Sequence, residues 1–356
     1  MEATLRRIAL APLLLALAAA GTGCWLAQDP GAAGSDSDGD GDSDTDTDTD
    51  ADADADADTD TSTCPNGLWE GDALVDSPAA IDELWGYRWI GGRLTVTCPA
   101  CADLEGLECL ESVDDDLELW NNPELIVVHG LNNVADVGGG LFIGFNPMLA
   151  DLLGLGSLAG VGGTLTVAQN PSLDSLFGFE NVTHVGGDLH IESNLSLIDV
   201  DGLSGLQDGA AIQELTVTHN PALERIDGLA GLASVGSLMI VNGNDALGSL
   251  DGLEGITEVG WILQIHDNAS LVDLAGLGSL QSVGGTLSIH GNAALGHLGL
   301  DYLVSVSENY TPDLTITQNP ALPTCDAEAL RDQLQAAGWG GDWSIGGNDD
   351  DGVCEE

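Results

Sequence analysis

The sequence predicts an all-β chain that folds as a single right-handed β-solenoid of about nine to ten coils of about 24 residues. The first observation is a phrase of the form apolar, any, apolar, any, any, Asn, any, any, Leu, which occurs nine times between Leu117 and Leu322. The second is its spacing, because the Asn returns in steps of 24, 24, 24, 26, 24, 24, 24 and 27 residues. The third is a Gly-Gly or Gly-Ser pair ahead of most phrases.

Each phrase predicts one short strand. Its apolar residues lie two apart, as Leu165 and Val167 do, which is the period of a strand with one buried face. Glycine pairs such as Gly162-Gly163 give the backbone freedom of a tight corner and disfavour a helix. We therefore expect turns or short extended pieces on the convex side, not full helices.

The repeated Asn predicts a ladder inside the coil. It stands at positions 122, 146, 170, 194, 220, 244, 268, 292 and 319, and Leu follows three residues later each time. Buried backbone groups need hydrogen-bond partners, so we expect the amide to turn inward and pair with neighbouring coils. Five of the nine Asn precede Pro, which favours extended geometry. The Asn side chain, and not a left-handed Asn backbone, should then matter.

Residues 1–24 are predicted to be an export signal. Arg6 and Arg7 precede an apolar run over residues 8–20, which is too short to span a bilayer stably. Gly21-Thr22-Gly23-Cys24 resembles the lipobox of bacterial lipoproteins, with Gly21 where that family usually has Leu. The resemblance implies a lipidated Cys24 after cleavage; cleavage and release without lipid is the alternative.

Residues 25–63 are predicted to be a disordered, Asp-rich linker. Thirteen Asp alternate with small residues between Asp36 and Asp60, and such a segment cannot bury enough surface to fold. We expect an extended tether. Its start fits the opening of a calcium-binding EF-hand loop, but Thr47 stands where that loop needs Glu, so only loose association with divalent ions is expected.

Two cysteine-containing caps should close the solenoid: residues 64–116 with the first coil, and residues 325–356. The repeats fill residues 117–324. Export favours disulfides over the zinc or redox chemistry that Cys98-Pro-Ala-Cys101 also permits. Cys325 should pair with Cys354. The other four cysteines allow three pairings, of which we expect Cys64 with Cys98 and Cys101 with Cys109.

The C-terminal cap should contain one helix and one strand. Asp326 is a suitable N-cap for a helix over residues 327–337, and Gly338 is a suitable stop. Residues 343–348 follow with the pattern of a last, degenerate strand. Such a cap covers the open end of the solenoid and prevents edge pairing.

The repeat also resembles a known family. The residues concerned are Cys64-Pro65, a first strand within residues 90–96, the Gly-Gly-x-Leu-x-Ile/Val-x-x-Asn repeats and the Cys-closed end. Together they resemble leucine-rich repeats, and more closely the L domain of the insulin and epidermal growth factor receptor families, from Cys64 to Cys354. The resemblance implies a solenoid fold and marks function poorly. The chain has more coils than one such domain and nothing resembling a kinase, so receptor signalling is not implied.

Composition excludes several functions. The six basic residues are all Arg, so the chain lacks the lysine that Schiff-base chemistry or a phosphate-binding loop requires. The formal net charge of −53 repels nucleic acid and anionic lipid headgroups. The sequence contains neither Gly-x-Ser-x-Gly nor His-Glu-x-x-His. We therefore expect no enzyme and no cofactor.

The outward positions of the strands are the candidate binding surface, as is usual in solenoids. Most are small or polar, but Trp120, Phe142 and Phe145 form an aromatic cluster in adjacent coils, with Glu118 beside it. Exposed aromatic residues suit stacking on sugars or anchoring a protein. The alternative is that the N-terminal cap folds over them.

A histidine pair is the candidate metal site. His266 and His290 occupy the same position in successive coils, so their side chains should lie about 5 Å apart, with Asp267 adjacent. Two imidazoles and a carboxylate can bind a metal. The commoner alternative is a surface ladder of histidines without an ion.

These observations predict an exported lipoprotein, anchored by lipid to the bacterial outer membrane or cell surface. Its solenoid would be a non-catalytic recognition surface for an extracellular polysaccharide or protein. A structural or adhesive envelope component without a specific small ligand is the competing hypothesis. An exposed aromatic cluster favours binding, and a covered one favours the structural role.

Overall fold

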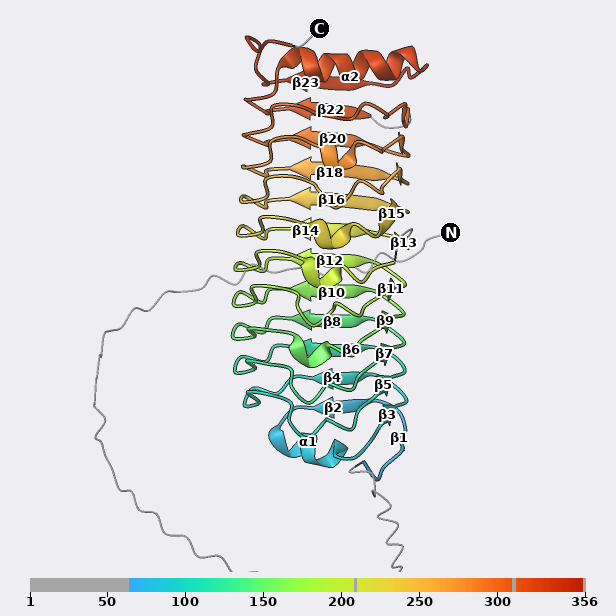
Figure 1. The fold of residues 1–356 in the computed structure, drawn as a ribbon, viewed down its shortest axis with the longest axis vertical. Helices are drawn as coiled ribbons and strands as arrows, with labels where there is room; N and C mark the ends of the chain where they lie inside the picture. The colour runs from blue at the N-terminus through green and yellow to red at the C-terminus, as the bar shows by residue number, and fades with distance from the viewer. Residues whose placement is uncertain (1–63, 208–209, 309–311, 355–356) are drawn as a thin grey trace, which may run out of the picture. The chain divides into compact units, whose positions relative to one another are not determined.

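The computed structural model describes residues 64–207, 210–308 and 312–354, and this part of the chain is a parallel β-solenoid of about ten turns (Figure 1). The predicted signal peptide, the Asp-rich linker and Cys24 lie outside the described residues. Nine strands of the widest sheet carry the repeated phrase, so the prediction of one strand per repeat is confirmed.

The wide sheet has twelve parallel strands stacked in chain order, three more than the nine repeats. They are β2 (Ala73–Val75), β4 (Leu94–Val96), β6 (Leu117–Trp120), β8 (Leu141–Gly144), β10 (Leu165–Ala168), β12 (Leu189–Glu192), β14 (Leu215–Thr218), β16 (Leu238–Asn242), β18 (Ile262–His266), β20 (Leu287–His290), β22 (Leu314–Thr317) and β23 (Trp343–Gly346). The strands β2 and β4 extend the sheet at one end and β23 at the other.

Two narrow sheets line a second side of the coil. One contains β1 (Leu68–Trp69), β3 (Trp89–Ile90), β5 (Ser112–Val113), β7 (Asp136–Val137), β9 (Gly160–Val161) and β11 (His184–Val185). The other contains β13 (Ala210–Ile212), β15 (Leu232–Val235), β17 (Glu258–Val259), β19 (Ser282–Val283) and β21 (Ser305–Val306). The break between them falls in the 26-residue step from Asn194 to Asn220, so the longer repeat coincides with the interruption.

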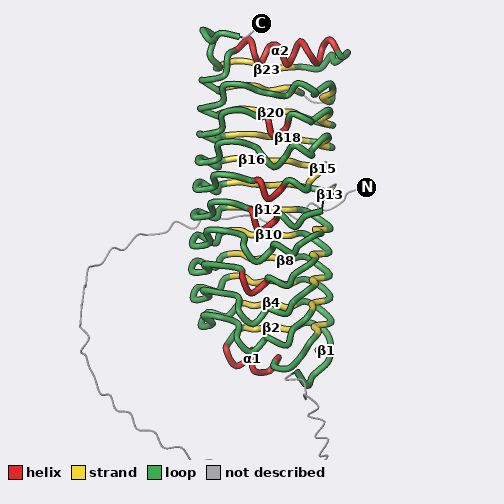
Figure 2. Tube along the Cα trace, viewed as in Figure 1, coloured by secondary structure: helices red, strands yellow, loops and turns green. Residues whose placement is uncertain are grey.

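Helices are short or terminal (Figure 2). Single 3-10 turns occur at η1 (Leu153–Leu155), η2 (Asp201–Leu203), η3 (Asp227–Leu229) and η4 (Ala275–Leu277). The two α-helices of the described ranges, α1 (Pro78–Leu84) and α2 (Thr324–Ala336), cover opposite ends of the solenoid. The prediction of a convex side without full helices is therefore confirmed there.

One continuous apolar core runs through the coils. The Leu three residues after each ladder Asn has 0% exposure in all nine repeats. The inward strand residues, such as Leu165 and Val167, are 1% exposed. A single coil cannot bury these side chains, and neighbouring coils bury them together.

The predicted Asn ladder is present. All nine Asn have 0% exposure. In the central rung, the Oδ1 of Asn244 accepts from the backbone N–H of Asn220 at 3.1 Å, and its Nδ2 donates to the carbonyl of Val217 at 2.9 Å. Asn348 adds one further rung that was not predicted. Its Oδ1 accepts from the backbone N–H of Asn319 at 3.1 Å.

In every coil, the residue directly before the ladder Asn is left-handed. The φ angle lies between 53° and 71° at Asn121, Phe145, Gln169, Ser193, His219, Gly243, Asp267, Gly291, Gln318 and Gly347. The prediction that the Asn itself is not left-handed is right. The left-handed corner one residue earlier was not predicted.

The predicted N-terminal disulfide pairing is wrong. Cys64 is bonded to Cys109, and Cys98 is bonded to Cys101. The last two lie at the two ends of a tight turn, in which the N–H of Cys101 donates to the carbonyl of Cys98 at 3.3 Å. That turn brings Cys98 and Cys101 together, which leaves Cys64 and Cys109 to pair with each other.

The C-terminal cap agrees with prediction except at the start of its helix. The disulfide Cys325–Cys354 and the strand β23 are present, and Gly338 follows the helix with φ of 101°. However, α2 begins at Thr324, so Asp326 is not its N-cap. The Asp326 carboxylate instead accepts the N–H of Leu298, at 3.0 Å, in the preceding coil. Within the described ranges, no helix is long and apolar enough to cross a bilayer.

Candidate functional site

The outward face of the wide sheet carries the candidate site. Because the strands pair in register, equivalent residues form straight rows across the sheet. The central row contains Leu74, Thr95, Glu118, Phe142, Thr166, His190, Thr216, Ile240, Gln264, Ser288, Thr315 and Ser344. Most of these side chains are polar, and Phe142 and His190 carry the only two rings of the row.

Two members of the aromatic cluster are open to solvent. Trp120 is 40% exposed and Phe145 is 43% exposed, so the N-terminal cap does not cover them. Phe142 is half-buried, and its ring lies over Gly144, which is the register partner of Trp120. The absence of a side chain at Gly144 thus leaves room for Phe142 next to Trp120.

The position of Phe145 differs from the prediction. It was expected on the outward strand surface, but β8 ends at Gly144 and Phe145 forms the left-handed corner, with φ of 58°. Such a backbone is unfavourable for a bulky residue. The equivalent corners at Gly243 and Gly291 use glycine, which has no such cost. The fold therefore does not require an aromatic residue at this corner.

A shallow hollow of about 240 Å³ adjoins Phe142. Its wall includes two carboxylates, Asp116 and Glu118, and two hydroxyls, Thr164 and Thr166. It therefore combines the apolar surface of a ring with several groups that accept or donate hydrogen bonds.

Arg93 fixes the two carboxylates of this hollow. Its guanidinium lies 2.6 Å from Oδ2 of Asp116 and 3.4 Å from Oε1 of Glu118. The hydrogen bond from Arg93 to Asp116, together with the charges of both carboxylates, raises the pKa of Arg93 further above its ordinary value. Both acids consequently keep a cation beside them.

The predicted histidine pair is stacked. The rings of His266 and His290 lie 3.7 Å apart between centroids, at 24° to each other. Burial, and then the charge of His290, lower the pKa of His266 to about 4. Asp267 stands at the left-handed corner. These three residues do not bring ligand atoms together as a metal set in the described chain.

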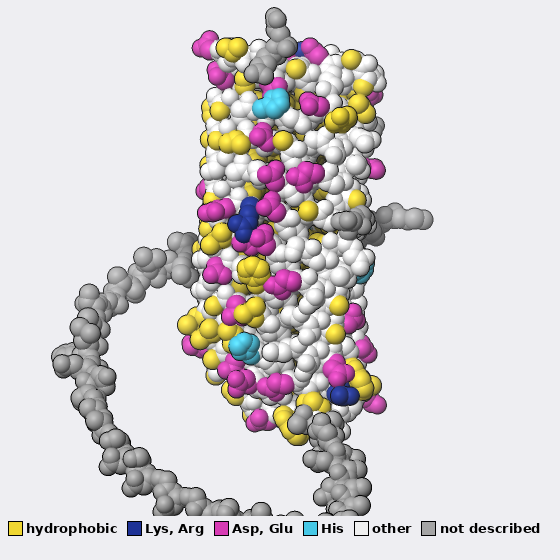
Figure 3. All heavy atoms as spheres, in the orientation of Figure 1, with side chains coloured by type: hydrophobic (Ala, Val, Ile, Leu, Met, Phe, Trp, Pro, Cys, Tyr) yellow, Lys and Arg dark blue, Asp and Glu magenta, His cyan; other side chains and the backbone are white. Residues whose placement is uncertain are grey.

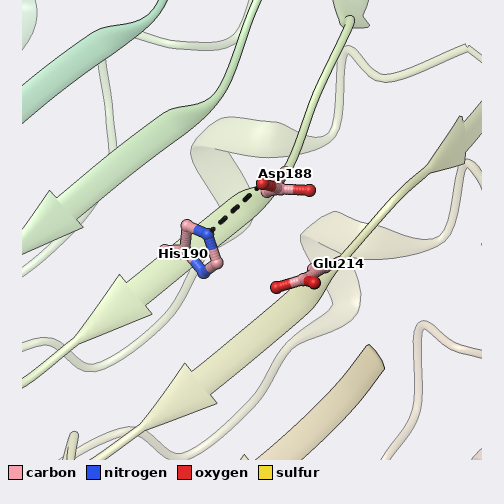
Figure 4. Close-up of side chains that lie close together, drawn as sticks. All are labelled: Asp188, His190 and Glu214. Atoms are coloured by element: carbon pink, nitrogen blue, oxygen red, sulfur yellow. Dashed lines mark ion pairs between the residues drawn. The ribbon is translucent and has the colours of Figure 1, made fainter. Parts of the chain in front are cut away.

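A different group of metal-ligating side chains does converge. Asp188, His190 and Glu214 each place one ligand atom within 4.8 Å of the others (Figure 4). Sequence reasoning missed this group because it compared equal positions in successive coils. The available signal was that Asp188 and Glu214 both directly precede a strand, and that His190 lies two residues after the first.

A second hollow, with a volume of about 440 Å³, lies at the C-terminal cap. His297 and Asp326 line it. Their side chains are already bonded to each other, with 3.0 Å between His297 Nδ1 and Asp326 Oδ2. No Phe, Tyr or Trp ring lines this hollow, so we place the candidate site on the sheet.

The described surface is acidic. Figure 3 shows many more acidic than basic side chains on the face that it displays. Each of the four described arginines lies within 4.0 Å of a carboxylate: Arg88, Arg93, Arg225 and Arg331. Little positive charge is therefore left for an anionic partner.

Comparison with known proteins adds no relative. No protein-family model, no curated protein and no solved structure matches the chain. The parallel β-solenoid is therefore supported by the structure and the sequence repeat, and the likeness to receptor L domains remains one of sequence pattern.

Proposed function

We propose that this chain is a non-catalytic recognition module that binds an uncharged or cationic extracellular polysaccharide. The observation that carries the proposal is the exposed aromatic cluster next to a hollow lined by carboxylates and hydroxyls. On a sheet whose other outward residues are mostly small and polar, this combination is local to strands β6 to β10.

The chemistry of the cluster suits a sugar. Aromatic rings stack on the apolar faces of sugar rings, while Asp116, Glu118 and the two threonines can exchange hydrogen bonds with hydroxyl groups. The formal net charge of −53 opposes anionic polymers. An uncharged or amino-sugar polymer is therefore the preferred ligand class.

The proposal includes display at the bacterial envelope, as an exported lipoprotein with an L-domain-like solenoid. A lipidated Cys24 would hold the chain at the membrane, and the Asp-rich segment would act as a tether that repels itself into an extended form. The change Cys24→Ser should release the protein from the membrane fraction. Retention there would refute lipid anchoring but would leave the binding site untouched.

The binding proposal is tested by capture of the purified protein on insoluble envelope polysaccharide and, separately, on surface-protein fractions. The site variant combines Trp120→Thr, Phe142→Thr and Phe145→Gly. Each new residue already occurs at an equivalent position of the same solenoid. Thr218 corresponds to Trp120, Thr166 to Phe142, and Gly243 to Phe145. The sheet should therefore fold normally, which circular dichroism checks.

We expect the site variant to lose at least about tenfold in capture, because stacked aromatic anchors contribute on the order of 1–2 kcal/mol. The control Phe177→Ala removes a ring that is 45% exposed but lies outside the wide sheet, and it should bind normally. Equal capture of all three proteins would refute the site. If wild type is captured by neither fraction, the polysaccharide proposal fails and a structural role gains support. Capture by surface proteins alone would indicate a protein ligand.

A further inference from the structure

Asp188, His190 and Glu214 lie on one side of two neighbouring strands (Figure 4). Asp188 and His190 are two residues apart in one extended segment, so their side chains share a face. The register pairs Leu189 with Leu215, which sets Asp188 beside Glu214 in the next coil. The sheet itself therefore brings one imidazole and two carboxylates together.

Both nitrogens of the histidine ring lie near carboxylates: Nε2 faces Asp188, and Nδ1 is 3.9 Å from Oε1 of Glu192. Nδ1 of His190 is 2.6 Å from the hydroxyl of Thr216, and Nε2 is turned toward Oδ2 of Asp188 at 3.8 Å. Thr164 donates its hydroxyl hydrogen to the same Asp188 oxygen at 3.3 Å. Outer partners of this kind orient metal ligands and select the tautomer. In the tautomer whose Nδ1–H donates to the Thr216 hydroxyl, the lone pair of Nε2 is free for an ion.

The charge of the group is not balanced within the described chain. Asp188 has His190 as its ion-pair partner, at 3.8 Å, and no arginine of the described residues pairs with Asp188 or Glu214. Three coils earlier, Asp116 occupies the position of Asp188 and has Arg93 at 2.6 Å. The same position thus has a built-in cation in one coil and none in the other.

From this geometry we infer that Asp188, His190 and Glu214 bind a first-row divalent metal ion of the Zn²⁺ type. One nitrogen and two carboxylate oxygens suit this class, whereas Ca²⁺ takes six to eight oxygens and Cu(I) prefers sulfur. Tetrahedral ligands at about 2.0 Å from zinc lie about 3.3 Å from one another. The three atoms, now within 4.8 Å, can reach that spacing by side-chain rotation.

The ion would keep at least one open position toward solvent. The side chains of Asp188 and His190 are 30% and 22% exposed, so water or an oxygen of a ligand can reach the metal. Sites with three protein ligands commonly hold water in this way. The inference concerns binding of the ion and does not depend on the proposed polysaccharide function.

The test is equilibrium dialysis and calorimetry of the full chain with Zn²⁺, in excess Mg²⁺ and Ca²⁺ that occupy weak carboxylate sites such as the Asp-rich stretch. Wild type should bind one tight equivalent. His190→Gln and Glu214→Gln should each weaken it by at least about 100-fold, since even outer-shell changes cost 10–100-fold. Zn²⁺ should also raise the unfolding temperature of wild type but not of these variants.

Two controls locate the ion. His129→Gln removes another exposed histidine, and His266→Gln breaks the stacked pair; both should retain the tight equivalent. If His266→Gln loses the tight Zn²⁺ equivalent while His190→Gln retains it, the ion binds at the stacked histidine pair and the inference is overturned. Absence of any tight equivalent in wild type, or unchanged binding in Glu214→Gln, would overturn it as well.

Discussion

The Asn ladder makes a quantitative prediction for Asn244→Ala. This side chain forms four hydrogen bonds: two from the N–H and Nδ2 of Asn220, at 3.1 and 3.3 Å, and two to Val217 O and Asn268 Oδ1, at 2.9 and 3.3 Å. Alanine leaves the buried N–H of Asn220 without its acceptor, which costs about 1–3 kcal/mol. The remaining bonds add on the order of 1 kcal/mol each. We expect the free energy of unfolding to fall by about 4–6 kcal/mol.

Urea unfolding followed by circular dichroism measures this change. Asn244→Leu fills the space but cannot accept, so it should be about as destabilising as alanine; a rescue by leucine would show that volume matters and hydrogen bonding does not. Asn133→Ala is the matched control. Asn133 is exposed and its Nδ2 donates to the Glu108 carbonyl at 2.6 Å, so the loss should be below about 1 kcal/mol. Equal losses in Asn244→Ala and Asn133→Ala would refute the reasoning.

Two further predictions concern pH and packing. The fold lowers the pKa of His266 from 6.5 to about 4, so the unfolded chain binds more protons than the folded chain between these pH values. The free energy of unfolding should therefore decrease as the pH is lowered from about 6.5 to about 4. His266→Gln should remove roughly 1–2 kcal/mol of this pH-dependent loss of stability, an amount already reduced for solvent screening of a half-buried ring. Identical pH profiles of urea unfolding for wild type and His266→Gln would contradict the prediction. A Cβ at Gly202 would clash with the carbonyl of Leu176, whereas one at Gly248 meets nothing within 4 Å. Gly202→Ala should therefore lose about 2 kcal/mol in thermal or urea unfolding while Gly248→Ala loses none; similar stabilities would contradict the packing.

The interior of the solenoid could be predicted because each inward position uses one kind of residue nine times. Leu follows each ladder Asn by three residues, and all these side chains are fully buried. The left-handed corner escaped prediction because its occupants share no chemistry: Phe145, Ser193 and Gly291 all adopt it. The backbone there is dictated by closure of the coil, which leaves no single residue type as a signal.

The caps and the site were harder to predict because they depend on contacts outside the repeat. The Cys98–Cys101 bond follows from a turn, which cysteine spacing alone does not reveal. Trp120 and Phe142 were identified because large rings stand out among small outward residues. The group around His190 was missed because its ligands occupy two different positions on two strands, and only the pairing of Leu189 with Leu215 sets them together.

The two candidate sites share the central row of the wide sheet. Register places Thr166 between Phe142 and His190, so these two residues are two strands, or about 10 Å, apart. An extended ligand lying along the solenoid axis can therefore touch the aromatic cluster and an ion at His190 together. The inward residues are committed to the core and the ladder, whereas outward residues are free to differ between coils. Recognition in this chain should accordingly arise from which coils carry rings, carboxylates or imidazole, and from their order along the row.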